Sequence, residues 1–265
     1  MKKLCCALLC LIVLQGCVEQ PPVKLRPEAA QQWLKLRGYE FDEKNFHHAA
    51  VHDDIMAISA FLDAGIDINA RDESDGRTVL ASAAGSGDLQ IVKMLLERGA
   101  DVNVKDNQGY TALIHAINGS NVEVENILLS QPKLDPNARG FNGSTPLAHY
   151  ASRNRKQAVQ RLLELGADVN AQDDDGDVAL NFAVQNQDVE ILDMLLDKGA
   201  NPNVKNTQGG TPLMFAAVYG NENAVYRLLK RGADASLKDT DGNTALYWAI
   251  KNKHESVVAI LQRSK

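Results

Sequence analysis

The feature that most restricts the fold of this chain is an internal repeat of about 33 residues. A glycine recurs at spacings of 33, 34, 33, 33 and 33 residues, at Gly76, Gly109, Gly143, Gly176, Gly209 and Gly242. Two residues after each glycine comes Thr or, once, Val, and seventeen residues later comes a leucine. Such a period is typical of stacked units, each of which completes its core only against its neighbours.

Each unit predicts a pair of helices followed by a turn. The threonine can cap the first free N–H groups of a short helix, as Thr78 would in the segment that contains Leu80. A second helix is expected to begin near Asp88 and to bury Ile91, Met94 and Leu95, which recur at helical spacing. Gly99 then supplies a left-handed residue that ends the helix. The polar segment that follows predicts a hairpin turn back to the next threonine.

Segments such as GRTVLASAAGSGDLQIVKMLLERGADVNVKD and GGTPLMFAAVYGNENAVYRLLKRGADASLKD resemble ankyrin repeats. The resemblance covers residues 46–265 as about seven repeats, the first of which lacks the threonine and the last of which forms the C-terminal cap. It implies an all-α fold, a solenoid of stacked helix-turn-helix units with hairpin turns. Residues 27–45, which begin at Pro27 and carry Trp33, Leu34 and Leu36, are expected to form an N-terminal capping helix.

Two departures from the pattern predict local irregularities. Pro132 stands where other repeats have the helix-ending glycine, so the second helix of the third repeat is expected to end early. Val178 replaces the capping threonine of the fifth repeat, which costs about 1 kcal/mol unless Asp177 provides the cap. At the C-terminus, the polar residues Gln262, Arg263 and Lys265 are typical of a cap.

The N-terminus predicts export. Lys2 and Lys3 precede an apolar stretch of signal-peptide length, and Leu14-Gln15-Gly16-Cys17 resembles the lipobox of bacterial lipoproteins. The resemblance implies cleavage after residue 16, lipidation of Cys17, and a tether over residues 17–26. The alternative is an ordinary secretory signal in which the cysteine is incidental. Val18 and Glu19 follow the cysteine, and this favours the outer membrane, with the protein on its periplasmic face.

Several kinds of chemistry find little support in the sequence. All four cysteines lie in the first seventeen residues, so the repeats can form neither a disulfide nor a cysteine-zinc site. The net charge of -6 argues against nucleic acid as a partner. His47, His48 and His52 could begin a metal site, but His47 occupies the ankyrin histidine column, which usually bonds neighbouring hairpins. No catalytic motif stands outside the repeats, so we expect no enzyme, cofactor or metal.

The remaining candidate is a binding surface on the concave face. The residue four after the threonine projects away from the packed face of each first helix, which gives a column made of His48, Ser82, His115, His149, Phe182, Phe215 and Trp248. Its aromatic end, with Tyr219 and Tyr247 nearby, is a candidate hot spot, although such rings also fill this column merely to pack helices. The run Asp173 to Gly176 is expected to be a solvated hairpin tip rather than a calcium loop. Acidic hairpin tips, including Asp174, Asp175 and Asp241, would favour a basic partner.

These features predict a lipoprotein that is a monomer when unbound and that holds a protein partner in its concave face. One role would be an immunity-type inhibitor of a secreted toxin or effector, and the other a scaffold or protective factor for an envelope enzyme. The membrane would be contacted only through the lipid. If the partner occupied His48, His115 and His149 instead of the aromatic end, binding would change between pH 5 and 8.

The lipid anchor can be tested by the substitution Cys17→Ser. We expect the protein to move from the membrane fraction to the soluble fraction without unfolding, because the repeats contain no cysteine and form their core without lipid. Fractionation followed by circular dichroism measures both effects. A processed variant that stays with the membrane would contradict the anchor.

Overall fold

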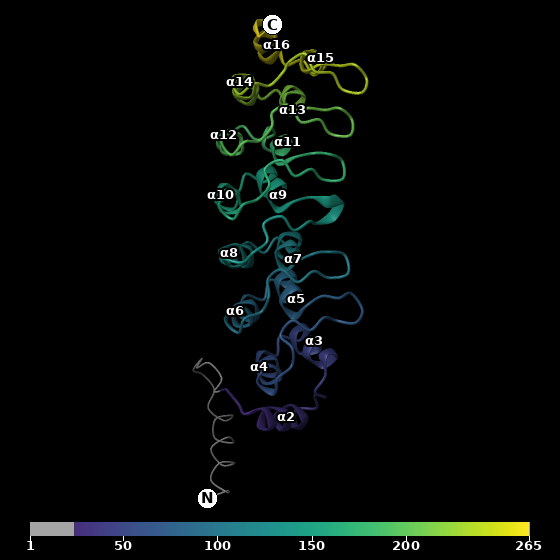
Figure 1. Cartoon of the computed structure of the whole chain (residues 1–265), viewed down its shortest axis with the longest axis vertical. Helices are drawn as coiled ribbons and strands as arrows, with labels where there is room; N and C mark the ends of the chain where they lie inside the picture. The colour runs from purple at the N-terminus through teal and green to yellow at the C-terminus, as the bar shows by residue number, and fades with distance from the viewer. Residues whose placement is uncertain (1–23, 265) are drawn as a thin grey trace, which may run out of the picture.

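The computed structural model of the protein describes residues 24–264. Within this range the chain forms seven antiparallel helix pairs stacked in a row, which we call repeats 1 to 7 in chain order (Figure 1). The first helix of each pair stands in an inner column, the second in an outer column, and the hairpins project from the inner column (Figure 1). No helix among residues 24–264 is long and apolar enough to span a bilayer.

The helices of this range are short and regular. The N-terminal helix is α2 (Pro27–Leu36). The inner helices are α3 (Glu43–Val51), α5 (Val79–Ser86), α7 (Ala112–Gly119), α9 (Pro146–Ser152), α11 (Ala179–Ala183), α13 (Pro212–Tyr219) and α15 (Ala245–Lys251). The outer helices are α4 (Ile55–Ala64), α6 (Leu89–Glu97), α8 (Val122–Ser130), α10 (Lys156–Glu164), α12 (Glu190–Asp197), α14 (Glu222–Lys230) and α16 (Glu255–Arg263). A 3-10 turn, η1 (Phe141–Gly143), lies in one hairpin, and residues 24–264 contain no β-strand, only an isolated bridge between Arg71 and Thr78.

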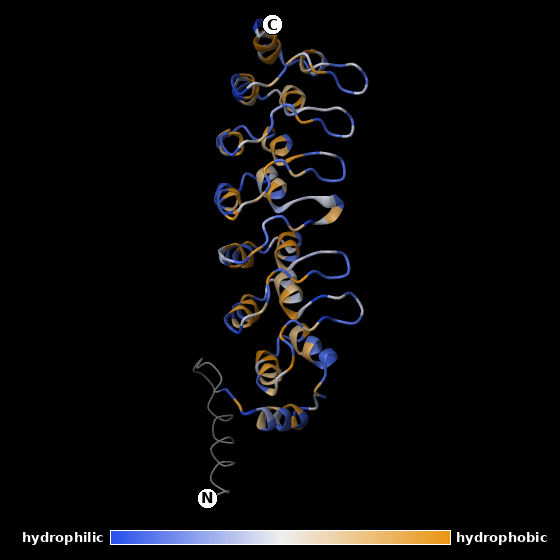
Figure 2. Cartoon of the chain, in the orientation of Figure 1, coloured by the Kyte–Doolittle hydropathy of each residue, from blue (hydrophilic) through white to orange (hydrophobic). Residues whose placement is uncertain are grey.

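The core runs along the stack between the two columns of helices, where the apolar residues gather (Figure 2). Six of the seven outer helices bury the leucine of the repeat pattern, from Leu95 in α6 to Leu261 in α16, and α4 buries Phe61 at this position. At one equivalent position, six inner helices carry a buried alanine, at Ala49, Ala83, Ala116, Ala183, Ala216 and Ala249. Because alanine is small, the inner helices of adjacent repeats can approach closely.

Threonine caps begin most inner helices, as predicted. The side chains of Thr78, Thr145, Thr211 and Thr244 accept a hydrogen bond from the N–H group three residues on. Thr111 is the exception, because its buried hydroxyl makes no such bond. In repeat 5 Val178 leaves the helix without a side-chain cap, and α11 has only five residues.

Asp177 does not replace the missing threonine. Its Oδ1 instead accepts hydrogen bonds from the side-chain amides of Asn181, at 2.5 Å, and of Asn206, at 3.0 Å. The carboxylate is therefore committed to its own helix and to the next hairpin, and the first backbone N–H groups of α11 remain without a side-chain acceptor.

Three kinds of hydrogen bond join successive repeats. At the base of the hairpins, an asparagine side chain accepts from the backbone of the next hairpin at Asn69, Asn103, Asn137, Asn170 and Asn203. At the tips, a backbone N–H donates to the preceding hairpin from Asn107, Asp174, Thr207 and Thr240. At the turns between helices, Asn121, Asn186, Asn221 and His254 bond carbonyls of the preceding repeat.

The junction between repeats 3 and 4 keeps only the first kind. Asn103 accepts from Asp135 N at 2.7 Å. Among the described residues, no tip bond joins the hairpins at 100–110 and 133–144, and Arg155 stands at the turn position without a hydrogen bond to repeat 3. Arg161 Nε of repeat 4 also donates to Leu129 O of repeat 3 at 3.0 Å, so this junction is not held by the base bond alone, but it has fewer hydrogen bonds than the junctions on either side of it.

Pro132 does not shorten α8, contrary to the prediction. The helix ends at Ser130, which corresponds to the last residue of α6, Glu97, 33 residues earlier. The difference lies in the residue that follows, because Gln131 is extended, with φ -68° and ψ 128°, where Arg98 is near-helical. A proline forces the residue before it out of the helical region, so it acts after the helix has already ended.

The two ends of the described stack are closed differently. The helix α2 begins at Pro27, as predicted, and packs on α4 with Leu34 fully buried, whereas Leu36 is 81% exposed. The helix α3 begins at Glu43, before residue 46, where the repeats were expected to start. At the other end, Tyr247 and Ile250 of α15 are 44% and 56% exposed, because no described repeat covers them. The predicted signal peptide, the predicted lipidation site Cys17 and most of the predicted tether fall within residues 1–23. These residues lie outside the described part of the chain.

Hydrogen exchange can test where the stack is weakest. We expect amides at 125–140 and at the start of repeat 5 to exchange sooner than those at 205–235, because the first region adjoins the junction with missing bonds and the second lacks its cap. Mass spectrometry of exchange at several times measures this order. Equal protection in all three regions would show that the missing bonds do not weaken the stack.

Candidate binding surface

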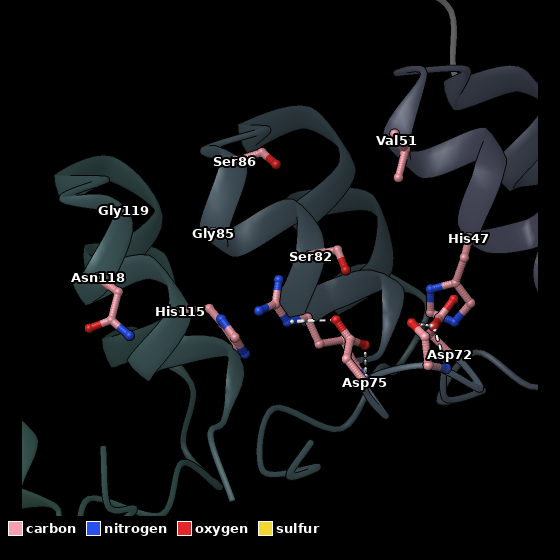
Figure 3. Close-up of a pocket in the computed structure, with 12 residues that line it drawn as sticks. His47, Val51, Asp72, Asp75, Ser82, Gly85, Ser86, His115, Asn118 and Gly119 are labelled. Carbon is pink, nitrogen blue, oxygen red and sulfur yellow. Dashed lines mark hydrogen bonds and ion pairs between the residues drawn. The ribbon is translucent and has the colours of Figure 1, made fainter. Parts of the chain in front are cut away.

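The inner face, formed by the inner helices and the hairpins beside them, is hollowed between repeats 1 and 3. The hollow measures about 460 Å³ (Figure 3). Val51 of α3, Ser82 and Ser86 of α5, and Asn118 of α7 line its helical side, and Asp72 and Asp75 line its hairpin side. This is the N-terminal half of the stack, away from the aromatic side chains.

Small residues create this hollow. Gly85 and Ser86 on α5 meet Gly119 on α7, where the side chains are least bulky. A Cβ added to Gly119 would collide with the carbonyl oxygen of Gly85, so glycine is what permits this approach. Asn121 fixes the contact by donating from Nδ2 to Gly85 O at 2.8 Å. The sequence signal for this site is the run of Gly and Ser at residues 85–87, which large or reactive side chains do not mark.

The hairpin side of the hollow carries negative charge. A hydrogen bond from the Ser74 hydroxyl and a weaker contribution from the Ser74 N–H group lower the pKa of Asp72. Asp75 lies beside Arg77, with 3.1 Å between Arg77 Nε and Asp75 Oδ2. Glu73 is exposed between these two aspartates. Among the residues that line the hollow, the two carboxylates of Asp72 and Asp75 outnumber the single arginine, Arg77, so this rim suits a basic or hydrogen-bond-donating group.

His115, expected to face a partner, is instead buried, with 6% of its surface exposed. Its Nε2 lies 2.8 Å from Asp106 Oδ2 in the hairpin before it. Burial disfavours the charged form of Asp106, but hydrogen bonds from the Tyr110 N–H group and from His115 outweigh it and lower its pKa. His115 therefore holds the hairpin against its helix, and the small part of its surface that is exposed lines the hollow.

Trp248 makes the same bond four repeats later. Its indole Nε1 donates to Asp239 Oδ2 at 2.9 Å, and Asp239 corresponds to Asp106. The ring is half-buried against the core, and Lys251 Nζ lies 4.5 Å from its centroid. Phe182 and Phe215 are also half-buried against the core. The three rings thus pack the helices and expose only part of their surface, while Tyr219 and Tyr247 are more exposed, at 45% and 44%.

His149 is not placed to respond between pH 5 and 8. Burial, together with the positive charge of Arg153, lowers its pKa to about 4. Its Nε2 is buried without a hydrogen-bond partner among the described residues. The expected pH dependence therefore cannot come from His149, because that imidazole stays neutral throughout this range. His48 is exposed and stacks on His52, with 4.0 Å between the ring centroids.

The other sequence candidates lie where their patterns predicted. His47 Nε2 bonds the carbonyl oxygen of Ala70 at 3.1 Å, which is the hairpin bond expected of its column. Asp174, Asp175 and Asp241 are exposed at hairpin tips. Asp173 accepts from the N–H groups of Asp175 and Asp177, so it shapes a turn. In the part of the chain that the structure describes, no three His, Cys, Asp or Glu side chains are grouped to hold a metal ion.

Comparison with known proteins agrees with this architecture. The sequence pattern of ankyrin repeats, taken three copies at a time, matches residues 26–106, 46–140, 100–173, 133–206 and 180–265. A solved ankyrin repeat domain from Acinetobacter baumannii is similar in structure, with a TM-score of 0.62 and 28% sequence identity over 70% of this chain and 96% of that chain. No curated protein matches the sequence.

The burial of His149 can be tested by the substitution His149→Phe. This introduces the phenylalanine that the next two repeats carry in the same column. As the pH falls from 6.5 towards 4, the unfolded chain takes up a proton at this imidazole before the native chain does, so wild-type stability falls over this window. We expect the free energy of unfolding of His149→Phe to fall less than that of the wild type over this pH window. Urea unfolding at several pH values measures both. A proton NMR titration of His149 with its midpoint near 6.5 would contradict the burial argument.

Proposed function

Because the chain belongs to the ankyrin-repeat family, whose repeats generally mediate binding between proteins, we propose that it holds a protein partner against its inner face. The observation that carries this proposal is the hollow between repeats 1 and 3. At about 460 Å³ it has room for a loop or a large side chain. Proteins of this fold typically bind rather than catalyse.

The partner is expected to insert a basic or donor-rich protrusion there. Asp72 and Asp75 supply acceptors along one rim, while Ser82, Ser86 and Asn118 offer hydrogen bonds from the helices. The exposed Tyr219 and Tyr247, with the acidic tips Asp174, Asp175 and Asp241, would extend the contact towards the C-terminal end. We therefore shift the expected centre of binding from the aromatic end to the hollow.

We further propose that this binding takes place in the periplasm, at the outer membrane, through the lipid on Cys17. Removal of residues 1–16 removes two lysines and no acid, so the mature charge is 26 - 34, or -8. A small, anchored, acidic binding protein suits an immunity-type inhibitor of a secreted toxin or effector. Affinity separates this role from a scaffold, because an inhibitor has one partner with a nanomolar or smaller Kd, whereas a scaffold has several weaker partners.

The hollow can be filled by Ser82→Trp. Phe182 and Phe215 occupy the same column in repeats 5 and 6, each between two neighbouring repeats, and Trp248 in repeat 7, so an aromatic ring is tolerated in this column. We expect the variant to keep its thermal midpoint and to lose at least a hundredfold in affinity for the partner that the Cys17→Ser protein retains from periplasmic extract. Calorimetry with that purified partner measures the change.

A matched control is Lys93→Trp, which places the same ring at an exposed position of the outer helix α6. It should bind as the parent does. If Ser82→Trp binds as tightly as Lys93→Trp, the partner does not enter the hollow, and the proposed site is wrong even though a partner exists.

A further inference from the structure

Two residues at the junction between repeats 3 and 4 break columns that every other repeat keeps. Tyr150 stands in the column of the six buried alanines, and Glu125 stands in an aliphatic column of the outer helices whose other members are Ile58, Val92, Val159, Leu192, Val225 and Val258. The two are neighbours in space and line the same pocket.

Both polar groups are withdrawn from water. Tyr150 is 1% exposed and Glu125 is 5% exposed. The Tyr150 hydroxyl lies close enough to the Glu125 carboxyl to lower its pKa, but the two groups form no well-aligned hydrogen bond. Burial raises the pKa of Glu125, against the lowering by the Tyr150 hydroxyl and by the charges of Arg155 and Arg153. A buried hydroxyl whose hydrogen bond is poorly aligned is incompletely satisfied, so it can donate to a ligand that enters the pocket.

The pocket beside these groups has a volume of about 200 Å³ and is lined by Ser120, Val122, Glu125, Tyr150, Arg153 and Arg155. It shares no lining residue with the hollow of the inner face. Arg155 stands at the turn position that Asn121, Asn221 and His254 use to bond the preceding repeat. The missing turn bond thus coincides with the pocket.

Two cations mark the mouth of this pocket. Arg153 and Arg155 are exposed, and neither forms an ion pair with another described residue. With one carboxyl inside and two guanidinium groups outside, the site carries one uncompensated positive charge. A monoanion bound between the arginines would neutralise it, and guanidinium groups suit the planar oxygens of a carboxylate.

We propose that this pocket is a binding site for a carboxylate group, held by Arg153 and Arg155 and by a hydrogen bond from the Tyr150 hydroxyl. A cationic ligand is disfavoured because it would have to pass both arginines to reach Glu125. The carboxylate belongs either to a small organic acid or to an acidic side chain of a protein. This site is separate from the hollow, so neither proposal depends on the other.

Propionate tests the free acid, and the blocked peptide acetyl-Gly-Glu-Gly-amide tests the protein side chain, with acetyl-Gly-Gln-Gly-amide as its neutral counterpart. Each is titrated at constant ionic strength into the soluble Cys17→Ser protein, and amide NMR shifts at 120–125 and 150–155 are followed. We expect saturable shifts with propionate or with the Glu peptide, and none with the Gln peptide. Saturation by propionate identifies a small acid as sufficient, and saturation by the Glu peptide alone identifies a protein source.

Three variants locate the site. Tyr150→Phe and Arg153→Gln should each raise the Kd about tenfold, the loss expected for one hydrogen bond to a charged acceptor. Arg263→Gln, which removes an exposed arginine far along the chain, should leave the Kd unchanged. Without any probe, Tyr150→Phe should keep or raise the thermal midpoint, because it removes a buried hydroxyl whose hydrogen bond is poorly aligned.

Two results would overturn the proposal. The first is the absence of saturable shifts with both propionate and the Glu peptide, or shifts that Tyr150→Phe and Arg153→Gln leave unchanged. The second is a fall in the thermal midpoint of Tyr150→Phe in the absence of probe. That fall would mean that the Tyr150 hydroxyl already forms a stabilising hydrogen bond with Glu125, so that neither group needs a ligand.

Discussion

Contact between the inner helices of adjacent repeats is the interaction on which the rest of this structure depends, because no helix pair here can bury its apolar face alone. The alanine column, which includes Ala83 and Ala116, sets how closely these helices approach. The asparagines from Asn69 to Asn203 then hold the hairpins in step. The hollow of the inner face follows from the same constraint, since it lies where Gly85 and Gly119 let two helices meet with little side chain between them.

Most of the fold could be predicted from the sequence because its determinants are local and repeat. Threonine caps, left-handed glycines such as Gly99 and buried leucines each occupy a fixed place within 33 residues. The binding surface was harder to predict. A helical wheel shows that His115 and Trp248 lie on the same face of their helices. It does not show that Asp106 and Asp239, nine residues earlier in the hairpins, form hydrogen bonds with them. Burial of His149 depends likewise on surroundings that no single helix specifies.

The hollow and the carboxyl pocket illustrate two different limits of prediction. The hollow exists because Gly85 and Ser86 have little or no side chain. A motif search that favours large or reactive side chains therefore passes over these residues. Glu125 and Tyr150 could have been found, because each contradicts its column, but their proximity required the structure. Comparing the repeats of one chain with each other therefore gives information that a family pattern alone does not.

The junction between repeats 3 and 4, which retains its base bond and lacks the tip and turn bonds, also has a mechanical meaning. Repeats joined end to end behave as springs in series, and a bending or twisting load is taken up mostly by the most compliant spring. Repeats 1 to 3 and repeats 4 to 7 are therefore expected to reorient about this junction more readily than about the junctions on either side of it. The hollow lies wholly within repeats 1 to 3 and the aromatic side chains within repeats 4 to 7, so a partner that contacts both would sense the angle between these two parts.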